Sequence, residues 1–367
     1  MKPIAFTPIV QGLPSTVPFV GPEAQERKRG RPFRARLGAN ENLFGPSPKA
    51  VDAMRAAATE NWKYCDPENH DLKQALAAKL GIAPANITIG EGIDGLFGTV
   101  ARLFVEPGTP VATSLGAYPT FNYQVAGSGG RLATTPYVND REDPEALLAL
   151  AKREGARLLY LSNPDNPMGS WWDAAAVQDL IRRLPENCLL CLDEAYGEFA
   201  PAGTLPPLDV DEPRVLRFRT FSKAYGLAGA RVGYAIGAAS VISGFDKIRN
   251  HFGVNRMGQV AALAALGDAA HLHFVIGEVA AARDRIAAIG RANGLVPLPS
   301  AANFVTLDCG RDGAYARRVL NALIERDVFV RMPGVAPLDR CIRVSAGTKP
   351  DLDVFEEVLP AALKAVG

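Results

Sequence analysis

Two side chains near the middle of the chain have types and positions that suit covalent chemistry. Lys223 lies in a stretch with two glycines, Thr220–Arg231, and Asp193 ends an apolar run that begins at Leu189. A lysine amine can form a Schiff base with an aldehyde, and a carboxylate at the end of a strand can keep a pyridine nitrogen protonated. The pair therefore predicts the chemistry of pyridoxal phosphate (PLP), with Lys223 as the catalytic residue.

A second motif, Gly90–Gly95, has the spacing G-x-G-x-x-G between a predicted strand and a predicted helix. This pattern is typical of dinucleotide binding, so an NAD-dependent oxidoreductase is a competing interpretation. Such a site also needs an acidic residue about 20 positions later to bind the ribose, but residues 107–139 contain no Asp or Glu. The motif is better interpreted as a cradle for one phosphate, formed by the backbone N–H groups of Gly92, Ile93 and Asp94.

The elements around these residues predict an α/β fold with a mostly parallel central sheet. Apolar runs alternate with helix-like stretches, a pattern typical of a sheet covered by helices on both faces. Ligands bind such sheets at the carboxyl ends of the strands, where Asp193 and Lys223 are expected. Strands are predicted at 86–90, 109–114, 157–162, 187–193 and 215–220, and helices at 95–104, 144–154 and 173–184.

The two ends of the chain are expected to combine into a smaller α+β domain. Residues 45–265 would form the large, PLP-binding domain, and residues 1–44 and 266–367 would form the small domain with an N-terminal arm. A helix is predicted at about 274–292, with strands at 303–307 and 342–345. The basic residues within 27–36 are interpreted as part of a solvated arm, because too few aromatic residues accompany them for RNA binding.

Composition favours an enzyme that acts on small molecules. The chain has 367 residues, and 48% of them are hydrophobic. Its net charge of +1 produces no strong positive electrostatic field that would attract nucleic acid or an anionic membrane. No stretch approaches the roughly 20 apolar residues of a membrane span, so a cytoplasmic location is expected. Cys188 and Cys191 are expected to be core residues on opposite faces of a strand. His271 and His273 lack neighbouring ligands, so no metal site is expected.

Eight short segments occur in the order of one known family. They are Leu37–Asn42 with Gly45–Pro48, Tyr64–Glu68, Gly92–Asp94, Pro119–Phe121, Ser162–Pro167, Asp193–Tyr196, Ser222–Arg231 and Ile342–Ser345. With these segments the chain resembles the fold-type-I PLP aminotransferases of classes I and II, and within them the histidinol-phosphate aminotransferase branch. The resemblance implies a homodimer that takes a small-molecule amino donor and a 2-oxo acid.

The resemblance also implies roles in cofactor binding. Lys223 would hold PLP and move a proton at the substrate, Asp193 would pair with the ring nitrogen, and Phe121 would stack on the ring. Tyr196 and Asn166 would bind the phenolic oxygen of the cofactor. The residues implied to bind its phosphate are Gly92, Ile93, Asp94, Ser222, Arg231 and, from a second subunit, Tyr64.

Four residues are implied to bind substrate. Arg343 would bind a carboxylate or, together with Arg331, the phosphate of histidinol phosphate, and Asn42 and Phe19 would complete the pocket. The chain departs from the family at Pro167–Gly169, where Met replaces the usual Thr. It also has Phe19 where a tyrosine is expected, which removes a hydrogen bond to a substrate phosphate that contributes roughly 1.5 to 3 kcal/mol.

Three functions therefore stay open from the sequence. The first is transamination between histidinol phosphate and 2-oxoglutarate in histidine biosynthesis. The second keeps the reaction and takes an aromatic amino acid as donor. The third is a threonine-phosphate decarboxylase, which would break a different bond at the substrate α-carbon. Sequence does not separate these functions, because the choice depends on how the substrate is held above the cofactor.

Overall fold

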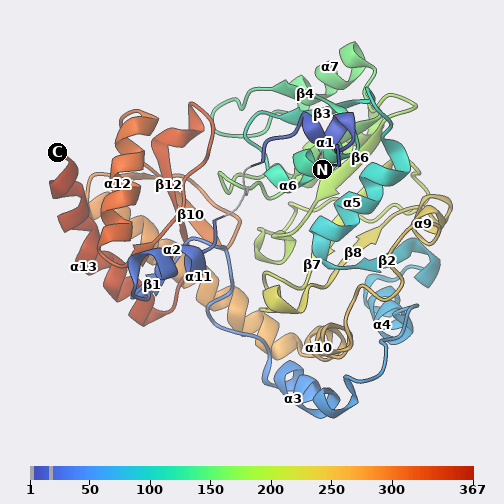
Figure 1. Ribbon diagram of the computed structural model, residues 1–367, viewed down its shortest axis with the longest axis horizontal. Helices are drawn as coiled ribbons and strands as arrows, with labels where there is room; N and C mark the ends of the chain where they lie inside the picture. Colours follow the sequence, from blue (N-terminus) through green and yellow to red (C-terminus); the bar gives the residue numbers. More distant parts are fainter. Residues whose placement is uncertain (1–3, 16–19) are drawn as a thin grey trace.

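The computed structural model describes residues 4–15 and 20–367 and is organised around a seven-stranded sheet (Figure 1). The strand order is β2-β8-β7-β6-β5-β3-β4, and only β8 runs antiparallel to its neighbours. This mostly parallel sheet confirms the predicted α/β class. The strands are β2 (Ile87–Gly90), β3 (Pro110–Ser114), β4 (Arg131–Thr135), β5 (Leu158–Ser162), β6 (Leu189–Asp193), β7 (Val215–Thr220) and β8 (Gly233–Ile236).

Helices cover both faces of this sheet. One face packs against α5 (Gly92–Phe104) and α6 (Pro119–Gly127), and the other against α7 (Pro144–Glu154) and α8 (Ala174–Arg182). Strands β5 and β6 are buried along their whole length, which explains why their sequences are continuous apolar runs. Cys188 and Cys191 lie in the cores on opposite faces, as predicted.

Local signals define the start and end of α7. The Asp143 side chain accepts a hydrogen bond from the backbone N–H of Glu145 at 3.0 Å, Pro144 occupies the first turn, and Gly155 ends the helix at a φ of 61°. These features are common helix caps. In contrast, Glu91 at the start of α5 forms no side-chain cap, so the first N–H groups of α5 remain available to a ligand.

Several helices pack beside the edge strand β2 and lead away from the large sheet. They are α3 (Pro48–Ala57), α4 (His70–Leu80), α9 (Ala239–Phe245) and α10 (Arg256–Leu266). The long helix α11 (Ala269–Ala292) then crosses to the second sheet (Figure 1). No single helix in the described ranges is both long and apolar enough to cross a membrane; α10 and α11 meet the two conditions only when taken together, and the pair is bent by 84°.

The second sheet contains residues from the C-terminal part of the chain. Its strand order is β12-β10-β9, with all pairs antiparallel, and α11, α12 (Gly313–Glu325) and α13 (Lys349–Val366) pack against its core. A separate parallel pair joins β1 to β11, which brings an N-terminal segment to this region. The remaining elements are β9 (Val296–Pro297), β10 (Phe304–Asp308), β12 (Cys341–Ser345), β1 (Ala35–Arg36), β11 (Val328–Phe329), α1 (Pro8–Gln11) and α2 (Pro22–Arg29).

The basic N-terminal segment is solvated as the sequence predicted, since Arg27, Lys28, Arg31 and Arg34 are exposed, but it is folded against the rest of the chain and is not an extended arm. Part of it forms the helix α2, and Arg29 and Arg31 both bond to Asp327 in the C-terminal part of the chain. Arg34 forms two hydrogen bonds with Glu357, at 2.7 and 3.0 Å. Arg29, Arg31 and Arg34 are therefore paired with carboxylates that are distant in sequence, and local charge runs carry no information about such partners.

Candidate active site

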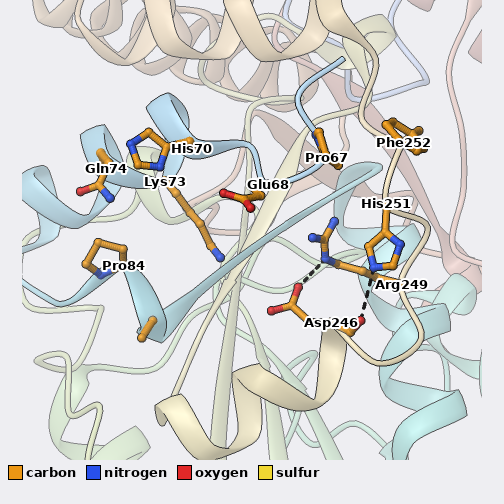
Figure 2. Close-up of a pocket in the computed structure, with 11 residues that line it drawn as sticks. Pro67, Glu68, His70, Lys73, Gln74, Pro84, Asp246, Arg249, His251 and Phe252 are labelled. Carbon is orange, nitrogen blue, oxygen red and sulfur yellow. Dashed lines mark hydrogen bonds and ion pairs between the residues drawn. The ribbon is translucent and has the colours of Figure 1, made fainter. Parts of the chain in front are cut away.

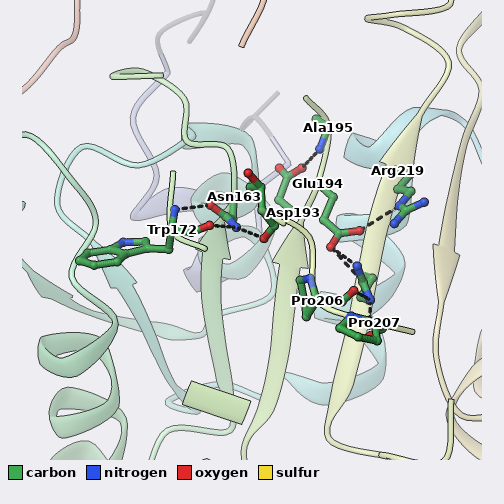
Figure 3. Close-up of polar contacts among 10 residues, drawn as sticks. Asn163, Trp172, Asp193, Glu194, Ala195, Pro206, Pro207 and Arg219 are labelled. Atoms are coloured by element: carbon green, nitrogen blue, oxygen red, sulfur yellow. Dashed lines mark hydrogen bonds and ion pairs between the residues drawn. The ribbon is translucent and has the colours of Figure 1, made fainter. Parts of the chain in front are cut away.

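Asp193 lies at the carboxyl end of β6, where the sequence placed it. Only 4% of the residue is exposed, and its two carboxylate oxygens have separate partners. The Tyr160 hydroxyl donates to Oδ2 at 2.8 Å. The Ala195 backbone N–H donates to Oδ1 at 2.9 Å (Figure 3). Burial raises the pKa of Asp193 to about 6. The carboxylate is thus held in one orientation, and no basic side chain among the described residues bonds to it.

The next residue, Glu194, anchors the same turn to the neighbouring strand. It is fully buried, and Arg217 and Arg219 of β7 donate to its two oxygens, each from Nε at 2.9 Å (Figure 3). A buried carboxylate with these charge-assisted bonds is fully satisfied. Glu194 therefore fixes the segment that follows Asp193 and is itself a structural residue.

Lys223 follows β7 and lies on the same edge of the sheet. Its Nζ donates to the backbone oxygen of Asn40 at 3.1 Å. Removal from water, reinforced by the charge of Arg343, lowers the pKa of Lys223 to about 8. The turn after Lys223 needs Gly226, because a Cβ there would lie 2.5 Å from the Gly45 oxygen. The amine thus has a substantial neutral fraction near physiological pH, as a nucleophile needs.

The Tyr196 hydroxyl points toward the same part of the candidate site as the Lys223 amine. The side-chain amides of Asn40 and Asn166 donate to this oxygen at 3.1 and 3.3 Å. Burial raises the pKa of Tyr196 to about 12, so the hydroxyl stays protonated and can donate a hydrogen bond.

The start of α5 forms a cradle with the shape and charge that a phosphate needs. Gly92 has a φ of 73°, and a Cβ at this position would lie 2.4 Å from Nη2 of Arg231. Only glycine lets the guanidinium approach the helix N-terminus so closely. Arg231 also donates to the Ser222 hydroxyl at 3.3 Å, and its Nη2 lies 3.5 Å from Asp94. Free N–H groups, a hydroxyl and a guanidinium suit an anion.

Arg343 belongs to β12 of the second sheet, and Arg331, whose Nη2 donates to the Val20 backbone oxygen at 2.8 Å, lies beside it. Arg331 and Arg343 form an antiparallel backbone bridge, with N···O distances of 3.2 and 2.6 Å. Arg343 donates from Nη1 to the Asn166 side-chain oxygen, while its buried Nε has no hydrogen-bond partner among the described residues. Burial, with a contribution from Arg331, lowers the pKa of Arg343 to about 10. A guanidinium in this state is suited to binding a carboxylate or phosphate.

Comparison with known proteins identifies the family. The family model for aminotransferase class I and II matches residues 35–359, which is most of the chain. The chain belongs to the class I and II aminotransferases. Two curated relatives are histidinol-phosphate aminotransferases: one from Moorella thermoacetica, 33% identical over 98% of this chain and 94% of the relative, and histidinol-phosphate aminotransferase 1 from Mesorhizobium japonicum, 34% identical over 90% of each.

Solved structures agree with this aminotransferase assignment. Histidinol-phosphate aminotransferase from Sinorhizobium meliloti, in complex with pyridoxal-5'-phosphate, is 57% identical, covers 99% of this chain and 98% of its own, and superposes with a TM-score of 0.96. Aspartate aminotransferase from Thermus thermophilus with maleate is 20% identical over 98% of this chain and 100% of its own, with a TM-score of 0.82, and shares the fold.

Phe121 of this aminotransferase does not line the site, contrary to the sequence expectation. It has no exposed surface, and its ring stacks on Tyr160 inside the core with centroids 4.7 Å apart. A ring without accessible surface offers no face to a cofactor. Tyr118 lies at the wall of the site instead, and its hydroxyl donates to Asp94 at 3.1 Å. The signal that identifies Tyr118 is its place as the first aromatic residue after β3.

Asn42 is also outside the group of side chains that meet in the site. Its amide donates to the Ala224 backbone oxygen at 3.1 Å, and its oxygen accepts from the Phe44 backbone N–H at 3.0 Å, so both polar groups bind main chain. Asn40 is the asparagine of this segment that contacts Lys223 and Tyr196. Phe19 lies outside the described residues.

Tyr64 lies apart from the other predicted residues within this chain. It is 80% exposed, and its ring packs on Phe252 with centroids 4.8 Å apart. Next to Phe252 is an open hollow of about 660 Å³, which includes Glu68, Lys73 and His251 in its lining and none of the predicted site residues (Figure 2). An exposed aromatic loop of this kind is available for contact with another molecule.

Proposed function

We propose that the protein is a PLP-dependent aminotransferase that moves an amino group between histidinol phosphate and 2-oxoglutarate in histidine biosynthesis. The observation that carries this proposal is that the Arg343 guanidinium acts on the buried Lys223 amine at the edge of the large sheet where β6 ends in Asp193, with Arg331 bridged to Arg343. The names of the curated relatives and the 57% identical solved structure support the same substrate.

The described side chains fit the cofactor. When bound, PLP supplies an aldehyde and a ring that accepts electrons from the substrate. Asp193 would face the ring nitrogen, and Lys223 would hold the aldehyde carbon and move the proton at the substrate α-carbon. Tyr118 would cover one face of the ring. Tyr196, together with Asn166, would stabilise negative charge on the phenolic oxygen.

The phosphate of PLP would bind in the cradle at the start of α5. Its donors would be the backbone N–H groups of Gly92, Ile93 and Asp94, with Ser222 and Arg231 beside them. Glu91 leaves this helix without a side-chain cap, which supports the assignment. In this arrangement residues 45–265 would be the PLP-binding domain, and residues 1–44 with 266–367 would form the smaller domain.

We also infer a homodimer in which Tyr64 completes the neighbouring site. The exposure of Tyr64 supports this arrangement. Mixing an inactive Lys223→Ala chain with an inactive Tyr64→Ala chain should restore some activity, because each hybrid contains one site with both residues intact. A mixed dimer without activity would place the whole site within one chain. A cytoplasmic location is proposed because all five cysteines are free and buried.

Histidinol phosphate fits the pair of arginines. Its phosphate carries about −1.5 to −2 charges at neutral pH, which two guanidinium groups can balance. The same groups would bind a carboxylate of 2-oxoglutarate in the second half of the reaction, so one site would serve both partners.

Two experiments test this function. Reduction of the PLP-loaded protein with borohydride, followed by peptide mapping, should place the label on Lys223; label on another lysine would overturn the assignment. A transamination screen should then compare histidinol phosphate, phenylalanine, tyrosine and threonine phosphate as donors. A preference for phenylalanine, or release of CO₂ from threonine phosphate, would replace the proposed substrate or reaction.

A further inference from the structure

We propose that Asn40 is a positioning residue that fixes the direction in which the Tyr196 hydroxyl donates its proton. The inference rests on the proposed function, because the expected acceptor is the phenolic oxygen of PLP. Asn40 is 2% exposed and belongs to the N-terminal segment, far in sequence from the strands of the large sheet. Its contacts connect this segment to two residues of the proposed active site.

Ser345 determines which way the Asn40 amide points. The Asn40 backbone N–H donates to the Ser345 Oγ at 3.0 Å, and this Oγ donates to the Asn40 Oδ1 at 3.1 Å. A serine hydroxyl has one proton, and here that proton lies on the bond to Oδ1. In this arrangement the Asn40 Nδ2 faces the other way, where it donates to the Tyr196 hydroxyl oxygen at 3.1 Å.

Tyr196 then has one direction left for its own proton. Its oxygen already accepts from Asn40 and from Asn166, at 3.1 and 3.3 Å. A phenolic hydroxyl can accept two hydrogen bonds and donate one. With both acceptor positions filled by amides, neither amide can take the proton, and the hydroxyl donates toward the site. The amides of Asn40 and Asn166 thus orient the Tyr196 hydroxyl, which is itself a hydrogen-bond donor.

The backbone of Asn40 is held as firmly as its side chain. Lys223 Nζ and Asn303 Nδ2 both donate to its carbonyl oxygen at 3.1 Å. Its φ is 54°, in the left-handed region that asparagine tolerates better than most residues. The conformation therefore selects Asn, Asp or Gly at this position, and only Asn supplies a donor to Tyr196.

The effect can be measured on the cofactor itself. A hydrogen bond from Tyr196 stabilises the phenolic oxygen of PLP in its charged form. Without that bond the oxygen would be more basic, so the proton shared with the Lys223 nitrogen would be held more tightly. The pH midpoint of the PLP absorption band should therefore rise in a variant whose Tyr196 hydroxyl is free to rotate.

The first variant is Asn40→Gly, which keeps the left-handed backbone and the carbonyl and removes the amide. In the PLP-loaded protein we expect the absorption midpoint to rise by about one pH unit, the size expected for weakening one bond to a charged group. The matched control is Asn139→Gly, since Asn139 has a φ of 50° on an exposed turn and should give no shift.

A double-mutant cycle decides whether Asn40 acts through Tyr196. Tyr196→Phe alone should raise the midpoint, and adding Asn40→Gly should raise it no further, because the hydroxyl is already absent. Equal shifts from Asn40→Gly in both backgrounds, or no shift in the parent protein, would overturn the inference. A parent protein with no pH-dependent PLP band would instead overturn the proposed function.

Asn40→Asp is the second variant, to be used if thermal unfolding shows that the Asn40→Gly protein is not folded. The carboxylate keeps the contact with Ser345 and the left-handed backbone but replaces the amide donor with an acceptor, which would draw the Tyr196 proton away from the site. The midpoint should rise more with Tyr196 present than in the Tyr196→Phe background. Equal rises in the two backgrounds would reflect only the added charge and would contradict the inference.

Discussion

Two groups of buried charged residues lie near each other at the ends of β6 and β7. One group, Glu194 with its two arginines, is paired within the described part of the protein, and the other, Asp193 and Lys223, is not. Glu194 is fully paired, because Arg217 and Arg219 bond to both of its oxygens. Within residues 4–15 and 20–367, the side chains of Asp193 and Lys223 have only neutral hydrogen-bond partners. Burial raises the pKa of Asp193 to about 6 and lowers that of Lys223 to about 8, in both cases toward the neutral form.

The difference indicates which charges serve the fold and which serve a ligand. A paired carboxylate such as Glu194 is stabilised by its own protein, whereas an isolated buried charge costs stability until an opposite charge arrives. Proteins tolerate such a cost mainly at functional sites. Asp193, Lys223 and Arg343 would receive their counter-charges from the cofactor and substrate. Substitutions in the two groups should therefore have opposite consequences.

The largest effect is expected for Asp193→Asn. An amide cannot keep the ring nitrogen protonated, so the catalytic constant should fall about a hundredfold or more while the protein still binds PLP. The cofactor-free variant should also be more stable than the parent at pH 7. Because the pKa of Asp193 is raised to about 6, its charge destabilises the fold above that pH, and the advantage should disappear near pH 4.

Steady-state kinetics and thermal unfolding across pH would check both halves of this prediction. Activity within a few-fold of the parent would show that Asp193 is not the partner of the ring nitrogen. A variant less stable than the parent at pH 7 would show that its charge is compensated within the protein.

Glu194→Gln should destabilise the protein, whereas Asp193→Asn should stabilise its cofactor-free form. Loss of the carboxylate leaves two buried arginines without their counter-charge, so the free energy of unfolding should fall by about 3 to 5 kcal/mol. Denaturant unfolding measures this loss. The matched control is Glu357→Gln, because Glu357 pairs with Arg34 on the surface and its removal should change stability little. Similar stability for both variants would remove the distinction between the two groups of charges.

Arg343→Met should weaken substrate binding without weakening the fold. We expect the Michaelis constant for histidinol phosphate to rise about tenfold to a hundredfold, the range for one lost bond to a charged group. It should rise less for phenylalanine, whose carboxylate offers Arg343 one negative charge instead of the roughly −1.5 to −2 charges of a phosphate. Arg285→Met is the control, since that guanidinium pairs with surface carboxylates. An unchanged preference between the two donors would argue against the phosphate site.

The smallest effect concerns Lys223 and pH. A lysine whose pKa is lowered to about 8 in the folded protein destabilises it at neutral pH, and the penalty fades as the pH rises from about 8 to above 10. The cofactor-free Lys223→Met variant should therefore be more stable than the parent at pH 7 and similar to it near pH 11. A constant difference across this range would mean that titration of Lys223 is not the cause.

Residues whose roles depend on local structure could be found in the sequence. Asp193 and Lys223 lie where parallel strands end, and strand ends can be located from apolar runs and glycines. The helix after β2 was predicted from residue 95 and begins at Gly92 in the structure. The antiparallel strand β8 was not predicted, because its four residues have no periodicity that distinguishes them from their surroundings.

Residues whose roles depend on tertiary contacts were harder to assign. Phe121 and Tyr118 are both aromatic and three positions apart, and only the burial of Phe121 against Tyr160 shows that Tyr118 is the one at the site. Asn40 and Asn42 are equally plausible by type. The contacts that separate them come from Tyr196 and Ser345, which are distant in sequence. Local pattern carries no information about such partners.

The pairing of β6 with β7 has a consequence for the register of the large sheet. Asp193 lies opposite Phe218, and its neighbour Glu194 turns to the arginines of β7. Successive side chains along a strand point to opposite faces, so a slip of one residue would exchange the two carboxylates. Asp193 would then face the arginines of β7, and Glu194 would face the site. The ladder of backbone hydrogen bonds therefore decides which of two adjacent acids is available for chemistry.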